Sequence, residues 1–228
     1  MCLFHVLHKL KSEYAIKLHI VHVNHQLRPV ICDEEQAFVE ELCKKWETPC
    51  YSFKIDCNAM AAETGMSGEE AGRAARYKAF SEVAERVDPK NGKLVKIAVA
   101  HNLEDQAETV LLRIIRGTGT DGLAGMGYIR QGEGNTAVIR PLLDISRHEI
   151  EDYLINNDLD AKRDHTNLEP IYKRNKVRLE LIPLVKEKYN ENIIEVLARL
   201  AGNAWMDREY LRGRAAEGLS SALKGQNT

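Results

Sequence analysis

Short apolar runs alternate with amphipathic stretches over the first half of the chain. Residues 16–23 and 97–100 are apolar runs with the length of buried strands, and residues 51–55 alternate as a strand. Apolar residues at helical spacing predict helices over residues 1–11, 33–46, 67–87 and 102–115. Ser67 and Glu70 have the spacing of a capping box that opens the third of these helices. Because strands that alternate with helices form parallel sheets, we expect a Rossmann-like α/β fold with helices on both faces of the sheet.

The same pattern predicts that the chain beyond residue 145 is nearly all helix. Ser146 and Glu149 have the spacing of a capping box, which opens a helix ending near residue 156. A basic helix begins near Tyr172 and is kinked or ended by Pro183, and a long helix starts at Ile193. We therefore predict an α/β domain over residues 1–145 and a helical subdomain, with the start of a linker, over residues 146–228.

Polar residues gather where the predicted strand 97–100 meets the next helix, namely His101, Asn102, Glu104 and Asp105. In open α/β sheets, ligands bind at this edge. Capping is the alternative, because Asn102 is a favoured N-cap residue and both acids suit the positive end of the helix dipole. Since histidine has no capping preference, His101 has the stronger case for a site role.

A second polar group, His22, Asn24 and His25, ends the strand predicted at residues 16–23. Because the carboxyl ends of parallel strands share one edge, we expect His25 and His101 to line the same crevice, with structural histidines as the alternative. A zinc site is disfavoured, because His22 and His25 point to opposite faces of a strand and no cysteine lies at ligand spacing.

Residues 117–122, GTGTDG, spell GxGxxG but follow a helix, whereas the dinucleotide-binding motif follows a strand. No GK[ST] sequence of a Walker A loop is present. We expect residues 117–127 to supply turns that need positive φ, or a mobile flap over the crevice.

Paired arginines mark three predicted helices: Arg73 with Arg76, Arg113 with Arg116, and Arg174 with Arg178. Arg113 and Arg116 are expected to be a solvated face, because cations suit a helix C-terminus. Residues 173–178 hold four cations in six residues, and either a phosphate-contacting strip or a solvated face fits them. Because the net charge is −2, a nucleic-acid partner requires a local basic patch of this kind.

Composition indicates an ordinary cytosolic protein that does not enter a membrane. The chain has 228 residues, of which 44% are hydrophobic and 29% charged, and no signal peptide is recognisable. No apolar run approaches the roughly 20 residues of a membrane span. The five cysteines form no CxxC pair and are expected to be reduced thiols.

Five segments, in this order along the chain, resemble the tRNA(Ile)-lysidine synthase family within the N-type PP-loop ATP pyrophosphatases. They are HVNHQLRP (22–29), SGEEAGRAARYKAF (67–80), AHNLEDQAETVLLRIIRGTGTDGLAGM (100–126), IRPLL (139–143) and YKRNKVRLELIPL (172–184). The third segment departs from the family where Asn102 and Glu104 replace the frequent His and Asp.

The resemblance implies an ATP- and Mg²⁺-dependent ligase that adenylates the C2 oxygen of the wobble cytidine of tRNA(Ile) with a CAU anticodon. The amine of L-lysine then displaces AMP and gives lysidine. A homodimer is left open. Such chemistry needs cationic and metal groups around the α-phosphate and an acid near the reacting base or amine.

The matched segments also imply roles for individual residues. Arg76, His101 and Asp105 become candidates for the adenylation site, and His22, Asn24 and His25 are expected near the nucleotide. The candidates for tRNA binding, or for closing on the intermediate, are Lys173, Arg174, Asn175 and Arg178.

The family's SGGxDS loop, which cradles the pyrophosphate of ATP, is absent from these residues. We expect the chain to begin just after that loop, with its first strand also missing, and to be inactive as given. Two alternatives are a non-catalytic tRNA-binding fragment and a sister PP-loop enzyme such as a cytidine thiolase. The thiolase is disfavoured because no cysteine pair suits an iron–sulfur site.

Overall fold

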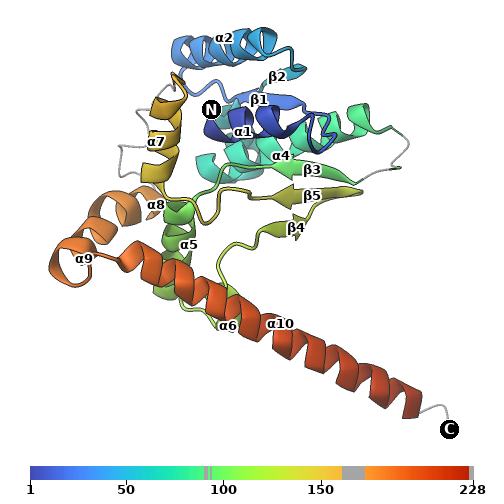
Figure 1. The fold of residues 1–228 in the computed structure, drawn as a ribbon, viewed down its shortest axis with the longest axis vertical. Coiled ribbons are helices and arrows are strands. Elements are labelled where there is room, and N and C mark those ends of the chain that lie inside the picture. The colour runs from blue at the N-terminus through green and yellow to red at the C-terminus, as the bar shows by residue number, and fades with distance from the viewer. Residues whose placement is uncertain (90–91, 93, 161–172, 226–228) are drawn as a thin grey trace. The chain divides into compact units, whose positions relative to one another are not determined.

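The computed structural model describes the chain except for residues 90–91, 93, 161–172 and 226–228 (Figure 1). It divides into two compact units. The first comprises Met1–Ala98 with Arg130–Ile139, and the second comprises Val99–Ile129 with Arg140–Thr228. The predicted domain boundary between residues 145 and 146 stays a prediction.

Two small sheets organise the first unit. Strands β1 (Ile20–Asn24) and β2 (Cys50–Lys54) are parallel, with Ile20 opposite Cys50 and Asn24 opposite Lys54. The second sheet has the order β3-β5-β4, formed by β3 (Val95–Ala98), β5 (Thr136–Ile139) and β4 (Ile129–Gln131), with β3 parallel to β5.

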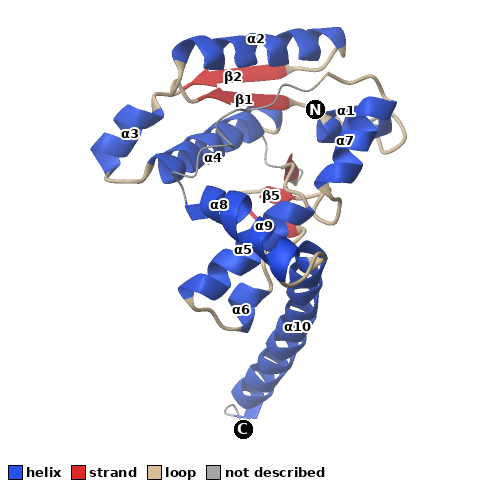
Figure 2. Cartoon of the chain, turned by 90° about the vertical axis from the view of Figure 1, so that its left-hand side faces the viewer, coloured by secondary structure: helices blue, strands red, loops and turns tan. Residues whose placement is uncertain are grey.

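Helices cover both faces of the pair β1 and β2, as predicted. Figures 1 and 2 show α2 (Pro29–Lys45) on one face and α4 (Gly68–Val87) on the other. Ser67 and Glu70 form the predicted capping box at the start of α4. The predicted fold class, a parallel α/β sheet with helices followed by a helical region, is confirmed.

The short elements of this unit differ from the prediction. Helix α1 (Cys2–Leu10) is followed by a turn in which the Ile16 N–H donates to the Lys11 carbonyl at 2.8 Å, so β1 starts four residues later than expected. Helix α3 (Cys57–Thr64) was not predicted. The Asp56 carboxylate caps it by accepting hydrogen bonds from the N–H groups of Asn58 and Ala59.

The second unit is helical. In its core, Ala107 and Val110 of α5 (Leu103–Arg116) pack with Ile194, Leu197 and Ala201, which belong to the last helix of the chain. The other helices are α6 (Thr120–Leu123), α7 (Arg147–Asn156), α8 (Lys173–Lys176), the π-helical turn η2 (Val177–Leu181), α9 (Ile182–Lys188) and α10 (Ile193–Gly225).

The structure of this unit bears on three predictions. The capping box of Ser146 and Glu149 is present at α7. The π-helical turn η2 ends at Leu181 and α9 begins at Ile182, so Pro183 lies in the first turn of α9 directly after a change of helix type. The predicted kink at Pro183 stays a prediction. The glycine-rich stretch 117–127 contains the single helical turn α6, so it is not loop throughout.

No helix within the described ranges is both long enough and apolar enough to cross a lipid bilayer.

Two leucines on α10 provide a matched test of where the helical core lies. Leu197 is 5% exposed and packs against α5, whereas Leu219 is 63% exposed. We expect Leu197→Ala to lower the free energy of unfolding in urea by about 2–5 kcal/mol, because it removes buried methyl groups and leaves a cavity. Leu219→Ala should change it by about 0.5 kcal/mol or less. Equal effects of the two substitutions would contradict this packing.

Candidate functional site

Capping explains part of the polar group that follows β3. The Asn102 side chain accepts a hydrogen bond from the Asp105 N–H at 3.0 Å, and Asp105 Oδ2 accepts one from the Asn102 N–H at 3.1 Å. This capping box fixes the start of α5 and aims the Asp105 side chain. The capping interpretation of Asn102 and Asp105 is therefore confirmed.

Asp105 also joins two arginines that lie about 70 residues later in the chain. Its Oδ1 accepts hydrogen bonds from Arg174 at 2.9 Å and Arg178 at 3.1 Å. Glu108, one turn further along α5, accepts from the Nε atoms of the same arginines at 2.8 and 2.6 Å. We call these four residues the arginine–carboxylate cluster.

The cluster contains a buried charge. The Glu108 side chain is 1% exposed, whereas those of Arg174 and Arg178 are 28% and 21% exposed. Burial alone lowers the pKa of Arg178, but the hydrogen bond and charge of Glu108 and the charge of Asp105 raise that pKa above its ordinary value. Two cations therefore neutralise two carboxylates around the buried Glu108 side chain.

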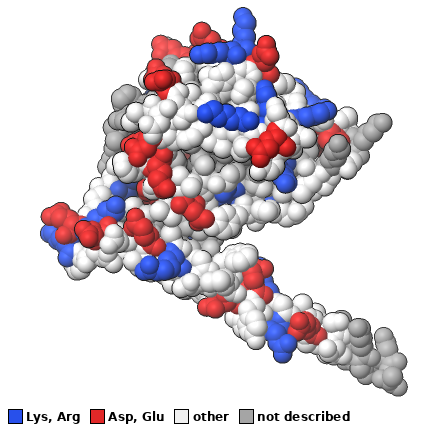
Figure 3. All heavy atoms as spheres, in the orientation of Figure 1, with Lys and Arg blue, Asp and Glu red and all other residues white. Residues whose placement is uncertain are grey.

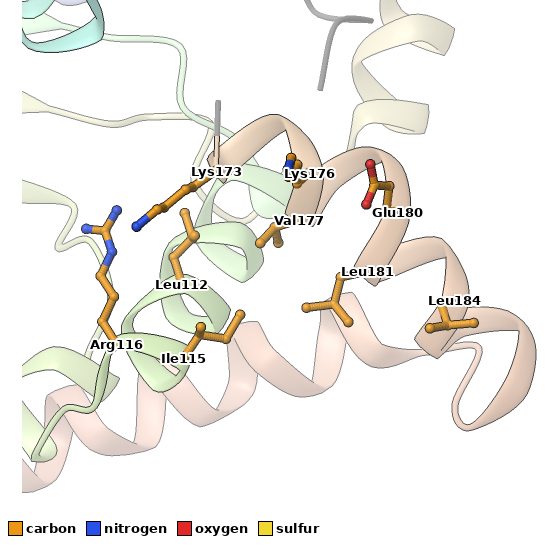
Figure 4. A pocket seen from close by; sticks show the side chains of 9 residues that line it. All are labelled: Leu112, Ile115, Arg116, Lys173, Lys176, Val177, Glu180, Leu181 and Leu184. Atoms are coloured by element: carbon orange, nitrogen blue, oxygen red, sulfur yellow. The ribbon is translucent and has the colours of Figure 1, made fainter. Parts of the chain in front are cut away.

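The predicted basic strip of residues 173–178 is divided between two faces. Arg174 and Arg178, four residues apart, share the face that carries the arginine–carboxylate cluster. Lys173 and Lys176 instead line a groove of about 530 Å³ (Figure 4). Asn175 is half-buried in α8 between them. The predicted tRNA contacts of all four residues stay predictions.

His101 is held by a buried arginine from the segment IRPLL. The Arg140 Nε–H donates to His101 Nδ1 at 3.2 Å, and Arg140 also donates to the Gly127 carbonyl at 2.7 Å. Because Nδ1 accepts this hydrogen bond, a neutral His101 ring carries its proton on Nε2. The structure therefore gives the ring a defined orientation and tautomer.

Two other charged residues have structural partners that the sequence did not indicate. The Glu104 carboxylate accepts from the Arg147 N–H at 2.9 and 3.0 Å, so it caps the start of α7. Arg113 donates to the carbonyls of Gly122 and Gly125, at 2.9 and 2.7 Å. The expectation that Arg113 belongs to a solvated face is therefore wrong, because its guanidinium satisfies carbonyls of the glycine-rich stretch.

In the first unit, Asn24 is a positioning residue at the end of β1. It is 2% exposed, and its amide group donates to Asp33 at 2.7 Å and to Gln36 at 3.1 Å. Its oxygen accepts from the Gln26 N–H at 3.0 Å. These bonds join β1 to α2, and the predicted contact of Asn24 with a nucleotide stays a prediction.

His25 lies among groups from β1, α3 and α4. Its Nδ1 is 3.1 Å from the Cys57 sulfur, and a Cβ added at Gly72 would lie 3.8 Å from its ring. Burial lowers the pKa of His25, and the positive charge of Arg76 lowers it further. Burial also lowers the pKa of His22. Both rings are therefore predominantly neutral at pH 7.

Arg76 of α4 is an exposed residue, although partial burial of its guanidinium lowers its pKa, and it forms no ion pair with another described residue. The ring of Tyr77, the next residue in the sequence, has the guanidinium carbons of Arg73 and Arg130 at 4.9 and 5.2 Å from its centre. His22, Asn24, His25 and Arg76 thus belong to the first unit, and His101 and Asp105 to the second. The predicted common crevice of His25 and His101 stays a prediction.

Sequence reasoning missed Glu108. An acid within a helix normally indicates the solvated face, yet Glu108 directly follows Ala107 and precedes Val110, both of which are fully buried. Its position three residues after Asp105 places both carboxylates on one side of α5. That spacing was the one feature of the sequence that could have indicated a role for Glu108. The arginines that neutralise it lie too far along the sequence for helical periodicity to reveal them.

A family model described as the PP-loop domain matches residues 1–185. Among curated proteins, the chain is 46% identical over 211 residues to the tRNA(Ile)-lysidine synthase of Clostridium tetani (strain Massachusetts / E88), covering 92% of this chain and 43% of that protein. It is 40% identical over 215 residues to the tRNA(Ile)-lysidine synthase of Clostridioides difficile (strain 630), covering 94% and 45%. The chain therefore spans less than half the length of these relatives.

A solved structure shares the fold. The U34-tRNA thiolase NcsA from Methanococcus maripaludis, solved with its [4Fe-4S] cluster, matches with a TM-score of 0.59 over 88% of this chain and 67% of that chain, at 17% identity. At this identity the likeness concerns the fold alone. The family model and the curated relatives agree with the five segments found in the sequence: the chain belongs to the PP-loop domain family, and its predicted resemblance to the tRNA(Ile)-lysidine synthases is confirmed.

Proposed function

We propose that this chain forms the catalytic part of a tRNA(Ile)-lysidine synthase. In the proposed reaction, the C2 oxygen of the wobble cytidine in tRNA(Ile) attacks the α-phosphate of ATP and releases pyrophosphate. The amine of L-lysine then attacks C2, and AMP leaves as lysidine forms. The enzyme is thus a ligase that forms a C–N bond at the expense of ATP.

The observation that carries this proposal is the arginine–carboxylate cluster. It joins two of the five segments that carry the sequence resemblance, 100–126 and 172–184, through four ion pairs. Because Oδ1 of Asp105 is shared by two guanidinium groups, we assign Asp105 the role of orienting Arg174 and Arg178 toward RNA. His101, with its proton on Nε2, supplies a hydrogen-bond donor to the adenylation site.

The first unit supplies groups that fit ATP. Arg76, which has no ion-pair partner among the described residues, suits a phosphate. The neutral ring of His22 lies on β1 and that of His25 just after its carboxyl end, where α/β sheets bind nucleotides. Asn24 holds this strand end in place. The 228 residues contain no SGGxDS sequence, so we assign no residue here to the pyrophosphate.

Mg²⁺ bound to the phosphates of ATP would neutralise charge that develops at the α-phosphate. Magnesium in such sites takes one or two carboxylates together with substrate phosphates, so it does not need a preformed cage. In the described part of the chain, no three His, Cys, Asp or Glu side chains gather as a cage.

The net charge of the chain does not favour an RNA partner, so RNA binding depends on local clusters of cations. On the face drawn in Figure 3, acidic and basic side chains are interspersed, in keeping with the net charge of −2. Phosphate groups of tRNA therefore require particular clusters of cations, and we assign Lys173, Arg174, Asn175 and Arg178 to tRNA binding.

The direct test is lysidine formation. We would compare the 228-residue chain with a version extended upstream by a strand and an SGGxDS loop, using tRNA(Ile), ATP, Mg²⁺ and lysine. We expect only the extended chain to bind ATP and to form lysidine. If the extended chain binds tRNA(Ile) but forms neither adenylated tRNA nor lysidine, the proposal fails and a non-catalytic tRNA-binding module takes its place.

Asp105→Asn and Arg174→Ala test the cluster in the extended chain. Each removes one partner of a paired charge, so we expect kcat/KM for lysidine formation to fall by about tenfold or more. Arg174→Ala should also raise the KM for tRNA. Lys186→Ala, which removes an exposed cation from α9, is the matched control and should leave both quantities unchanged. If Arg174→Ala behaves like this control, the assignment to tRNA binding is wrong.

Glu108→Gln tests the buried charge by itself. The amide keeps the shape of the side chain but leaves two guanidinium groups facing one carboxylate in place of two. We expect the free energy of unfolding to fall by roughly 2–4 kcal/mol, because the partners of a buried charge are left uncompensated. Glu187→Gln, an exposed residue of α9, is the control for the same chemical change and should have no measurable effect. Equal stabilities of the two variants would show that Glu108 carries no charge in the folded protein.

A further inference from the structure

Charged and aliphatic side chains are unevenly distributed along a groove on the second unit. Its floor is aliphatic, formed by Leu112 and Ile115 of α5 with Val177, Leu181 and Leu184 of η2 and α9. Figure 4 shows the cationic side chains of Arg116 and Lys173 at one end and Leu184 at the other. Lys176 and Glu180 line the same groove.

The groove exists because the basic segment is helical. Residues 173, 176, 177, 180 and 184 recur at helical spacing, so they share a face that differs from the face of Arg174 and Arg178. The inner arginines are occupied by Asp105 and Glu108. The π-helical turn η2 supplies Val177, Glu180 and Leu181, and π-helical turns are rare and often occur at functional sites.

The cations of the groove are available to a ligand. Arg116, Lys173 and Lys176 are exposed, and none of them forms an ion pair with another residue in the ranges that the structure describes. Ile115, at 59% exposure, and Leu184, at 43%, leave aliphatic surface uncovered beside them. An anionic group bound at the Arg116 and Lys173 end would gain charge-assisted hydrogen bonds, and the groups attached to it would cover the aliphatic floor.

We propose that this groove binds an unstacked nucleotide of the tRNA substrate. Its phosphate lies between Arg116 and Lys173, and its ribose and base cover Leu112, Ile115, Val177 and Leu181. This inference rests on the proposed function, which supplies the RNA partner. It assigns to the outer face of the basic segment a contact separate from that of Arg174 and Arg178.

The dimensions and polar groups of the groove match a nucleotide. Its volume of about 530 Å³ lies within the range of roughly 300–1,000 Å³ that is typical of small-molecule sites. Lys176 offers donors and Glu180 offers an acceptor, as hydrogen bonding to the edge of a base requires. Proteins that recognise RNA bind mainly single-stranded loops, whose bases are free to leave the stack.

An acidic amphipathic helix is the alternative occupant of a groove between two helices. It would carry its acids along its whole length, whereas the groove concentrates two of its three cations at one end and carries an acid, Glu180, on its wall. A nucleotide has a single anionic group at one side of an uncharged body. The charge arrangement therefore favours the nucleotide.

Binding of labelled tRNA(Ile) to the 228-residue chain, measured by fluorescence anisotropy over a series of salt concentrations, tests the proposal. Arg116→Ala and Lys173→Ala should each weaken binding about three- to tenfold and lower the slope of log K against log salt by about 0.7. Ile115→Ala should weaken binding by about threefold or more with an unchanged slope, because it removes only apolar contact.

Matched controls distinguish a loss of tRNA binding caused by the groove from one caused by any change at the surface. Lys186→Ala removes an exposed cation of α9, and Ile155→Ala removes a 72% exposed isoleucine of α7. Both should bind tRNA(Ile) as the unmodified chain does. Because every substituted side chain is exposed, urea unfolding is expected to confirm that the variants fold.

If the unmodified chain binds tRNA(Ile) and the three groove variants match their controls, the groove proposal is overturned while the proposed function stands, and a protein segment becomes the better occupant. If the extended chain forms no lysidine but the groove variants still weaken tRNA binding, the synthase proposal fails and the groove stands. If the unmodified chain binds no tRNA(Ile), the groove proposal is overturned as well.

Discussion

The second unit depends on the neutralisation of a carboxylate that water does not reach. An ionised Glu108 in a dry interior is costly, and it is tolerated because two guanidinium groups from a distant segment of the chain pair with it. That requirement fixes the rotation of α8 and η2 against α5, since Arg174 and Arg178 must both face inward. Once this rotation is set, the apolar side chains Val177 and Ile182 enter the core and Lys173 and Lys176 turn outward.

The same constraint explains why one basic segment serves two surfaces. Charge density alone suggested a single strip for phosphate binding over residues 173–178. The structure divides the strip, because residues four apart share one face and the lysines lie on another. The inner arginines pair with the carboxylates of α5, which orient them for the tRNA contact proposed above, and the outer lysines line a separate groove. The position of each cation on the helix, and not the density of cations in the sequence, distinguishes the arginine face from the lysine face.

Local signals in the sequence predicted the elements whose causes are local. The capping boxes at Ser67 and Ser146, and the cap of α5 at Asn102, depend on residues three apart, so they follow from spacing. Helix α3 depends on the single cap Asp56 in a stretch with little periodicity, and it was missed. The partners of Glu104, Glu108 and Arg113 lie in other segments, and only the folded chain brings them together. The resemblance to a family identified the candidate residues, but it gave no information on which side chains pair.

The five residues from His101 to Asp105 each hold a different part of the second unit. His101 accepts from Arg140, Asn102 caps α5, the Leu103 N–H donates to the Ile145 carbonyl, Glu104 caps α7, and Asp105 binds two arginines. These five residues are consecutive in the backbone, so a shift of one residue displaces the contacts of the others. The energetic effects of substitutions within this segment are consequently not additive, and the contribution of each residue has meaning only in the presence of the other four.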